Sequence, residues 1–259
     1  MSKENGLLMA IDVGNTHTVI GLFEGERQAH HWRVFTVADR TADEYGVLMW
    51  SLFGASDMEV PQVTGIIVSC VVPPLLSVIE ELCRNLFKVE PVIVGPGIKT
   101  GMPILYENPR EVGADRIVNA VAAYERAKKA TIVVDFGTAT TFDYVTEKGE
   151  YVGGVIVPGI GISLDALYRR TAKLTRVELV RPRKVVGRNT VNAIQSGITY
   201  GYVELVDGVV RQIEKQEGID AYVLATGGFA SLIAAESSTI NEVDGFLTLE
   251  GLRLVYERN

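Results

Sequence analysis

The stretch Leu7–Leu22, LLMAIDVGNTHTVIGL, determines how the rest of the chain is interpreted. Its apolar run ends at Asp12, a short polar segment follows, and alternating residues resume at Thr18. This pattern predicts two strands joined by a tight turn, in which Gly14 and Asn15 can take a positive φ. The turn offers a carboxylate, an amide, hydroxyls and backbone N–H groups, which can hold a phosphate and a hydrated cation. A plain hairpin turn remains an alternative, because Asp and Asn are common in turns.

A second stretch of the same kind starts near the middle of the chain, at Ala130–Gly149, ATIVVDFGTATTFDYVTEKG. Aligning Asp135 with Asp12 also places Gly137 on Gly14, and in both copies an alternating strand follows. Two unrelated turns would rarely agree in residue type, order and flanking strands. The repeat therefore predicts two similar lobes and favours a phosphate clamped between two hairpins.

Each half of the chain shows a similar order of elements. Residues 1–128 contain three strand-like segments, a helix with a capping box, a buried strand, a second helix and a short strand. Residues 129–259 repeat the three strands and then combine helices with a strand that enters a glycine turn. We therefore expect an α/β protein of two lobes, each a mixed sheet with an antiparallel three-strand meander continued by parallel crossovers. Helices are expected at about 42–53, 76–87, 114–126, 162–174, 191–215, 231–235 and 247–256.

The bulk composition excludes several classes of protein. The chain has 259 residues, 47% hydrophobic and 22% charged, as soluble globular proteins do. Its net charge of −7 argues against nucleic-acid binding as the main task. The chain shows neither an apolar run of bilayer length nor a signal peptide, so we expect a cytoplasmic protein without membrane contact. Cys70 and Cys83 have no CxxC or Cys/His partners and are expected to be small buried hydrophobes.

Two more segments carry candidate chemistry. Asp115 starts a helical stripe, where it is either a helix cap or a carboxylate that takes a proton from a hydroxyl. Gly227 and Gly228 follow a strand and precede a helix, so they form either a tight turn or a close backbone approach to a nucleotide. The interruption of the 191–215 helix by Gly197, Gly201 and Gly208 suggests close packing, including against another subunit.

Five motifs stand out along the chain: DVGNTHT at 12–18, GADR at 113–116, DFGTATT at 135–141, GRNT at 187–190 and ATGG at 225–228. In this order and spacing they resemble the type III pantothenate kinases, a family of the actin-like superfamily that includes acetate and sugar kinases. The resemblance extends from Leu7 to about Tyr256 and implies two duplicated ribonuclease H-like lobes. The family often has Asn at the position of His17, a difference that leaves a backbone contact there intact and changes any side-chain contact.

The resemblance implies ATP-dependent phosphorylation of pantothenate to 4′-phosphopantothenate, the opening step of coenzyme A synthesis, by a homodimer. Asp115 would be the general base. Asp135 would hold a monovalent cation, potassium or ammonium, and Asp12 would hold water of the magnesium ion that accompanies ATP. The candidate ATP-binding residues are Asp12, Val13, Gly14, Asn15, Thr16, His17, Thr18, Val19, Thr138, Gly227 and Gly228. The candidate pantothenate-binding residues are Tyr106, Gly113, Ala114, Asp115, Arg116 and Thr190.

The physical requirements of phosphoryl transfer agree with these roles, because the reaction needs positioning and charge neutralisation more than covalent chemistry. Asp12 and Asp135 facing the phosphates would be repulsive without cations. Asp115 needs no unusual pKa, since an ordinary Asp is ionised at pH 7. Arg116 can pair with the pantothenate carboxylate or with the phosphoryl group, and the sequence does not decide between them. The same scaffold could also serve another small-molecule kinase, a phosphohydrolase or a non-catalytic ATP-binding accessory factor.

Overall fold

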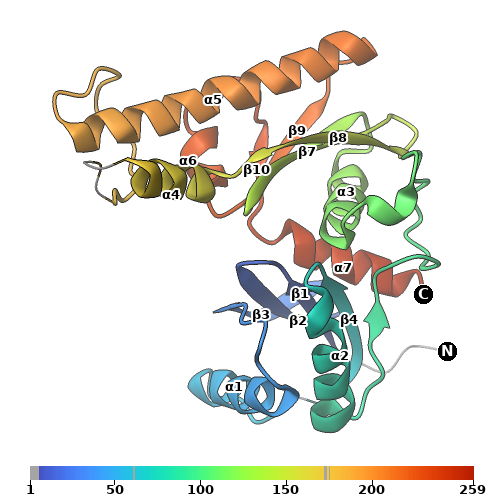
Figure 1. Cartoon of the computed structure of the whole chain (residues 1–259). Helices are drawn as coiled ribbons and strands as arrows, with labels where there is room; N and C mark the ends of the chain where they lie inside the picture. The colour runs from blue at the N-terminus through green and yellow to red at the C-terminus, as the bar shows by residue number, and fades with distance from the viewer. Residues whose placement is uncertain (1–5, 61, 172–173, 175) are drawn as a thin grey trace. The chain divides into compact units, whose positions relative to one another are not determined.

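A computed structural model of the chain describes residues 6–60, 62–171, 174 and 176–259 (Figure 1). The described residues form two compact units. The first comprises the described parts of Met1–Gly101, Asn108–Ala122 and Thr248–Asn259, and the second comprises those of Met102–Glu107 and Ala123–Leu247. The expected boundary between the lobes after residue 128 stays a prediction. Each compact unit contains residues from both sides of that boundary, because Met102–Glu107 belongs to the second unit and Thr248–Asn259 to the first.

The first unit contains a five-stranded sheet in the order β3-β2-β1-β4-β5. Its first three strands form an antiparallel meander, and β4 and β5 are added in parallel. The strands are β1 (Leu7–Val13), β2 (His17–Glu24), β3 (Arg27–Phe35), β4 (Val63–Cys70) and β5 (Val92–Ile93). The helices are α1 (Ala42–Ala55), α2 (Pro73–Leu82) with a π-helical turn at Cys83–Phe87, a 3₁₀ turn at Pro109–Glu111, α3 (Ala114–Ala127, which continues into the second unit) and α7 (Leu247–Glu257).

The second unit repeats this topology, with the order β10-β9-β6-β7-β8. Again three antiparallel strands are followed by two parallel ones. The strands are β6 (Thr131–Phe136), β7 (Ala139–Val145), β8 (Tyr151–Pro158), β9 (Tyr222–Gly227) and β10 (Glu242–Val243). The helices are α4 (Ile160–Arg170), α5 (Thr190–Glu217) and α6 (Ala230–Ala234). The expected α/β fold of two duplicated lobes is therefore confirmed.

The last helix completes the first unit because small residues let it approach the sheet closely. A Cβ at Gly21 would lie 2.8 Å from the side chain of Leu249, and one at Gly65 would lie 2.0 Å from the hydroxyl oxygen of Tyr256. Within α7, a Cβ at Gly251 would lie 2.0 Å from the carbonyl oxygen of Val118. The face of the sheet that bears Gly21 and Gly65 is thus covered by the C-terminal end of the chain.

The hairpin turn after β1 differs from the expected one. Neither Gly14 nor Asn15 has a positive φ, so this expectation is wrong. Instead, the N–H of Gly14 donates to the carbonyl of His17 at 3.0 Å, and a Cβ at Gly14 would lie 3.0 Å from that same oxygen. The absence of a side chain, rather than a left-handed backbone, explains the glycine.

The helix expected at 191–215 is longer and unbroken, since α5 runs for 28 residues from Thr190 to Glu217. Asn189 caps its start and Gly218, with φ 68°, ends it. The interruption expected at Gly197, Gly201 and Gly208 is wrong, because the apolar face of α5 packs into the core. A Cβ at any of these glycines would meet no described atom within 4 Å, so they make no close packing within the described chain.

The remaining differences are smaller. The helix expected at 162–174 is α4, which ends at Arg170, and the rest of that expectation falls partly on residues 172 and 173, outside the described residues. Cys83 is buried, which raises the pKa of its thiol to about 12. Cys70 is only half-buried and donates to the carbonyl of Val72 at 3.2 Å, so it was wrongly expected to be a fully buried hydrophobe. Among the described residues, no helix meets both the length and the hydropathy that a membrane span requires.

A buried carboxylate fixes the loop between α6 and β10. Asp207 of α5 is 4% exposed and accepts hydrogen bonds from the Ser238 N–H and the Thr239 hydroxyl, each at 2.8 Å. The hydroxyls of Ser237 and Ser238 also donate to it. Burial alone would raise the pKa of Asp207, but these hydrogen bonds outweigh it and lower the pKa to about 2.

We predict that Asp207→Asn destabilises the protein by ~2 kcal/mol at pH 7. Because the folded-state pKa is about 2, below the ordinary value of 3.8, the stabilisation is present above pH 4 and is lost as pH falls toward 2. Urea unfolding of parent and variant from pH 7 to pH 3 measures this difference. Asp220→Asn, at an exposed Asp just after α5, is the matched control and should change little. Equal effects of the two substitutions would contradict the prediction.

Candidate active site

The hairpin of the first unit surrounds Asp12, the next-to-last residue of β1. In the sheet register, Asp12 lies opposite Val19 on β2 and Ser69 on β4. Asn15 and Thr16 are exposed at the tip of the turn. The carbonyl of Thr16 accepts the N–H of Thr36 at 3.0 Å, which anchors the turn from the neighbouring strand. Polar groups of this hairpin are therefore presented from a rigid sheet.

The side chain of His17 packs against Phe35. Its ring centroid lies 5.1 Å from that of Phe35. Burial, with a further contribution from Arg33, lowers the pKa of His17 below the ordinary 6.5. The lowered pKa favours the uncharged form of His17 at pH 7, so a phosphate bound at this hairpin would depend on backbone N–H and hydroxyl groups.

The hairpin of the second unit repeats the arrangement around Asp135, the next-to-last residue of β6. Asp135 lies opposite Thr141 on β7 and Thr226 on β9. Both acidic residues therefore have a hydroxyl-bearing residue beside them on the parallel strand, Ser69 or Thr226. This equivalence was not visible from the motifs alone, because Ser69 and Thr226 lie on strands far from the hairpins in sequence.

The structure brings the glycine turn after β9 to Asp135, as a site shared by the two motifs requires. Gly227 has φ 93°, and a Cβ there would lie 2.7 Å from Oδ1 of Asp135 and 2.6 Å from the carbonyl oxygen of Phe136. A Cβ at Gly137 would lie 3.7 Å from the same Oδ1. Only Gly227 therefore depends on the absence of a side chain to approach Asp135, whereas a Cβ at Gly137 would make an ordinary contact.

A further close approach involves Gly159, which lies outside the five sequence motifs. A Cβ at Gly159 would lie 2.1 Å from the carbonyl oxygen of Thr138, a predicted ATP-binding residue. Gly159 is also the N-cap of α4. The available sequence signal was the Pro158-Gly159 pair, in which Pro158 is the last residue of β8.

Asp115 lies in the first turn of α3, where its carboxylate folds back over the helix start. Its Oδ1 accepts the N–H of Arg116 at 2.8 Å, and a Cβ at Gly113 would lie 2.4 Å from that oxygen. Gly113 is therefore required by the position of the carboxylate. Burial raises the pKa of Asp115, and the backbone and charge of Arg116 only partly offset this effect. The proposed role does not require an unusual pKa, and the raised pKa makes the ionised carboxylate of Asp115 a stronger base.

The remaining predicted substrate residues lie in the second unit. The ring of Tyr106 packs over Gly153, where a Cβ would lie 3.3 Å from ring carbons. Thr190 is exposed as the first residue of α5. Gly113 to Arg116 belong to the first unit, as do Asp12 to Val19. The grouping of Tyr106 and Thr190 with Asp115, and of Asp12 with Asp135, therefore stays a prediction.

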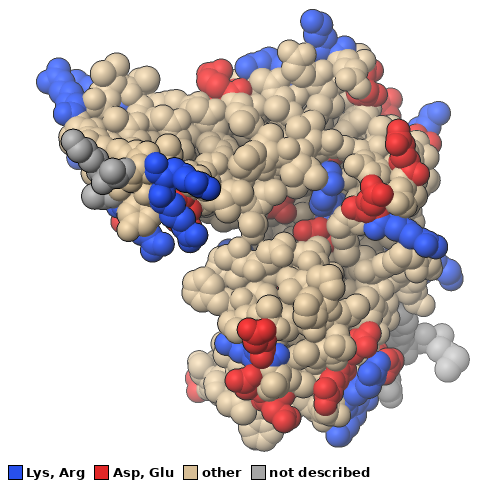
Figure 2. All heavy atoms as spheres, viewed as in Figure 1, with Lys and Arg blue, Asp and Glu red and all other residues tan. Residues whose placement is uncertain are grey.

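The described residues contain no group of three or more His, Cys, Asp or Glu side chains able to hold a metal ion. A cation at Asp135 would thus need hydroxyl, carbonyl or phosphate oxygens as its further ligands, which suits a hard cation bound together with a nucleotide. Acidic and basic side chains are mixed over the visible face of the molecule (Figure 2).

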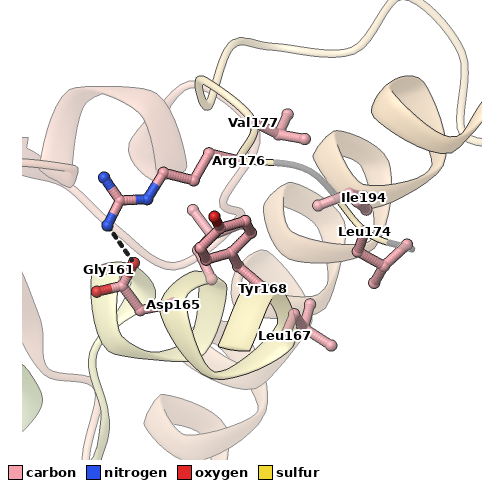
Figure 3. A pocket seen from close by; sticks show the side chains of 9 residues that line it. Gly161, Asp165, Leu167, Tyr168, Leu174, Arg176, Val177 and Ile194 are labelled. Atoms are coloured by element: carbon pink, nitrogen blue, oxygen red, sulfur yellow. Dashed lines mark ion pairs between the residues drawn. The ribbon is translucent and has the colours of Figure 1, made fainter. Parts of the chain in front are cut away.

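A separate cavity of about 360 Å³ lies between α4 and the start of α5 (Figure 3). In it Arg176 lies 3.9 Å from Asp165 and 5.4 Å from the ring centroid of Tyr168. The arginine and aspartate side chains are 72% and 48% exposed. None of the predicted site residues lines this cavity, so it is not assigned to the candidate active site.

Solved structures resemble this fold at low sequence identity. Component A of the (R)-2-hydroxyglutaryl-CoA dehydratase from Acidaminococcus fermentans matches with a TM-score of 0.57 at 14% identity, covering 96% of each chain. The ethanolamine utilization protein EutJ from Carboxydothermus hydrogenoformans matches with a TM-score of 0.54 at 12% identity, covering 95% of this chain and 89% of that one. These similarities establish the fold alone.

Sequence comparison identifies the family. The sequence profile of the type III pantothenate kinases matches residues 8–212. The type III pantothenate kinase of Myxococcus xanthus is 58% identical over 253 residues, covering 98% of this chain and 99% of the relative. That of Syntrophus aciditrophicus is 54% identical, covering 98% of this chain and all of the relative. The chain therefore belongs to the type III pantothenate kinase family.

Proposed function

We propose that this chain uses ATP to phosphorylate pantothenate to 4′-phosphopantothenate, the first step of coenzyme A biosynthesis. Family membership over almost the whole chain supports the activity. One structural observation supports it most directly. The motifs shared with the family lie at strand ends and helix starts, at the ends of β1, β6 and β9 and at the first turns of α3 and α5. These are the places where a backbone can approach phosphates.

Asp115 is proposed as the general base. Its Oδ1 accepts the Arg116 N–H, which orients the carboxylate that would take the proton from the primary hydroxyl of pantothenate. Burial raises the pKa of this carboxylate, which makes its ionised form a stronger base. Arg116 and Gly113 to Ala114 would border pantothenate on the same helix start, with Tyr106 and Thr190 contributed by the second unit.

The two hairpins are proposed to hold the phosphates of ATP, the first through residues 12–19 and the second through Thr138 together with Gly227 and Gly228. The closeness of Gly227 to Asp135 supports a joint site within the second unit. Asp135 would bind a monovalent cation, potassium or ammonium, and Asp12 would hold water of a magnesium ion. These cations would neutralise the phosphate charge that an acidic protein cannot balance with its own side chains.

We also propose that the enzyme is a cytoplasmic homodimer. The resemblance implies the dimer, and the open space at Gly197, Gly201 and Gly208 on α5 is compatible with a second subunit.

The activity is tested by measuring ADP release with pantothenate, acetate and a panel of sugars in the presence of magnesium and potassium. We expect turnover with pantothenate and no more than background turnover with the remaining acceptors. Turnover with acetate or a sugar only, or ATP binding without any turnover, would contradict the proposed function in favour of a different kinase or an accessory factor.

We predict that Asp115→Asn lowers kcat by roughly 10²–10⁴-fold, the range expected for a positioned acid–base group. The Kd for ATP should be nearly unchanged. Asp43→Asn is a matched control, because Asp43 is the second residue of α1 as Asp115 is of α3, and both lie in the first turn. If both variants retained the parental kcat, Asp115 would only stabilise the N-terminus of α3 and would not be the general base.

We predict that Asp135→Ala abolishes the effect of potassium. The parent should bind ATP more tightly, and react faster, in KCl than in equimolar choline chloride, whereas the variant should not distinguish the salts. Calorimetric ATP titration in both salts measures this even in an inactive variant. Asp165→Ala, which removes a half-exposed carboxylate elsewhere in the same unit, should behave as the parent. A persisting potassium effect would place the cation elsewhere.

A further inference from the structure

We propose that Asp143 is a positioning residue for this reaction, because it links the hydroxyl beside Asp135 to the segment that carries Tyr106. The inference rests on the proposed function. Asp143 lies in β7 and is 0% exposed. A carboxyl group is costly to bury unless hydrogen bonds satisfy it, so the donors around it indicate what its position achieves.

Asp143 lies on the same face of the sheet as the candidate cation site. Side chains alternate along a strand, so Thr141 and Asp143 point to one face of β7, while Phe142 and Tyr144 point to the core on the opposite face. The register places Asp135 opposite Thr141 and Val133 opposite Asp143. On this face of the sheet, the Val133–Asp143 pair is therefore the next pair after Asp135–Thr141 and lies farther from the hairpin turn.

The first contact of Asp143 orients a hydroxyl next to Asp135. The Thr141 hydroxyl donates to Oδ2 of Asp143 at 3.2 Å. A hydroxyl has one hydrogen, and Thr141 uses it in this bond. Toward its other neighbours the Thr141 oxygen can therefore offer only lone pairs, which accept hydrogen bonds or bind a cation. Directly opposite side chains in an antiparallel pair have Cβ atoms about 5 Å apart. Lone pairs of Thr141 and the carboxylate of Asp135 together favour a cation between or beside them.

The second contact of Asp143 holds Tyr151. The Tyr151 hydroxyl donates to Oδ1 of Asp143 at 2.6 Å, and Tyr151 is 0% exposed. In the register, Asp143 pairs with Gly154, which has no side chain to compete with the phenol for the space above Asp143. The side chain of Tyr151 is thus locked at the start of β8.

The backbone of Tyr151 in turn holds the segment that ends in Tyr106. The Tyr151 N–H donates to the carbonyl of Pro103 at 2.9 Å, and the N–H of Leu105 donates to the carbonyl of Tyr151 at 2.8 Å. The next residue, Tyr106, packs its ring over Gly153. One carboxyl group therefore supports two predicted site elements, and all the residues of this chain of contacts lie in the second unit.

Two substitutions separate the two contacts. Tyr151→Phe removes the phenolic hydroxyl and keeps the backbone pairing. Asp143→Asn keeps an oxygen that can accept from Tyr151, but its amide N–H₂ group then faces Thr141 and turns the threonine hydrogen toward Asp135. We expect Tyr151→Phe to raise the KM and Kd for pantothenate about tenfold, the usual loss for a hydrogen bond to a charged group, with the potassium dependence unchanged. We expect Asp143→Asn to raise the potassium concentration for half-maximal rate about tenfold, with less than a threefold change in pantothenate KM.

The control is Tyr144→Phe. It removes a phenolic hydroxyl from β7, the strand of Asp143, on the opposite, core-facing side. Its KM values and potassium dependence should match those of the parent. Pantothenate Kd is measured by calorimetry without nucleotide, and Tm is measured for every variant. Variants that keep the parental constants, or that lose pantothenate binding, potassium response and Tm together, would overturn the inference, because the second pattern indicates a purely structural role.

The parent enzyme is assayed first, so that failure of the proposed function can be told apart from failure of the role of Asp143. A parent that does not phosphorylate pantothenate contradicts the proposed function, and the role of Asp143 falls with it. A parent that phosphorylates pantothenate without responding to potassium or ammonium overturns the Thr141 half of the inference alone. A parent with both properties, combined with unaffected variants, overturns only the role of Asp143.

Discussion

A carboxylate near the end of a central strand needs polar neighbours on the adjacent strands, because apolar neighbours would not stabilise its charge. Both sheets meet this requirement in the same way. Asp12 and Asp135 each lie one residue before the end of a strand that has a neighbouring strand on both sides. The in-register neighbours on the parallel strands are Ser69 and Thr226, whose hydroxyls can share a cation or a phosphate with the carboxylate. The duplicated topology therefore repeats a local chemical environment as well as a strand order.

Glycines follow from the same requirement, because groups that converge on a carboxylate leave no room for side chains. Gly227 and Gly113 each lie where a Cβ would meet Oδ1 of an aspartate, Asp135 in one case and Asp115 in the second. Only at Gly227 does a left-handed backbone add to the constraint. Both glycines are therefore explained by a neighbouring aspartate side chain. The motif of Gly113 contains that aspartate, and the motif of Gly227 contacts it.

Much of the architecture could be predicted from the sequence, because hydrophobic alternation and the repeated acidic hairpin are local signals. The meanders, the capping box at Thr41 and the start of α3 at Ala114 follow from residues close together in the chain. The unbroken course of α5 could not be predicted, since packing of its apolar face outweighs the low helix propensity of three glycines. The raised pKa of Asp115 and the burial of Asp143 depend on neighbours that only the folded chain brings together. The candidate site was thus predictable in its residues but not in its electrostatics.

The return of α7 to the first sheet has a consequence for how the polypeptide is made. The face that bears Gly21 and Gly65 is covered by Leu249 and Tyr256, which follow the second unit in the chain. The first sheet consequently keeps an apolar face open until the second unit has been synthesised. A nascent chain that lacks α7 would expose that face to chaperones and proteases.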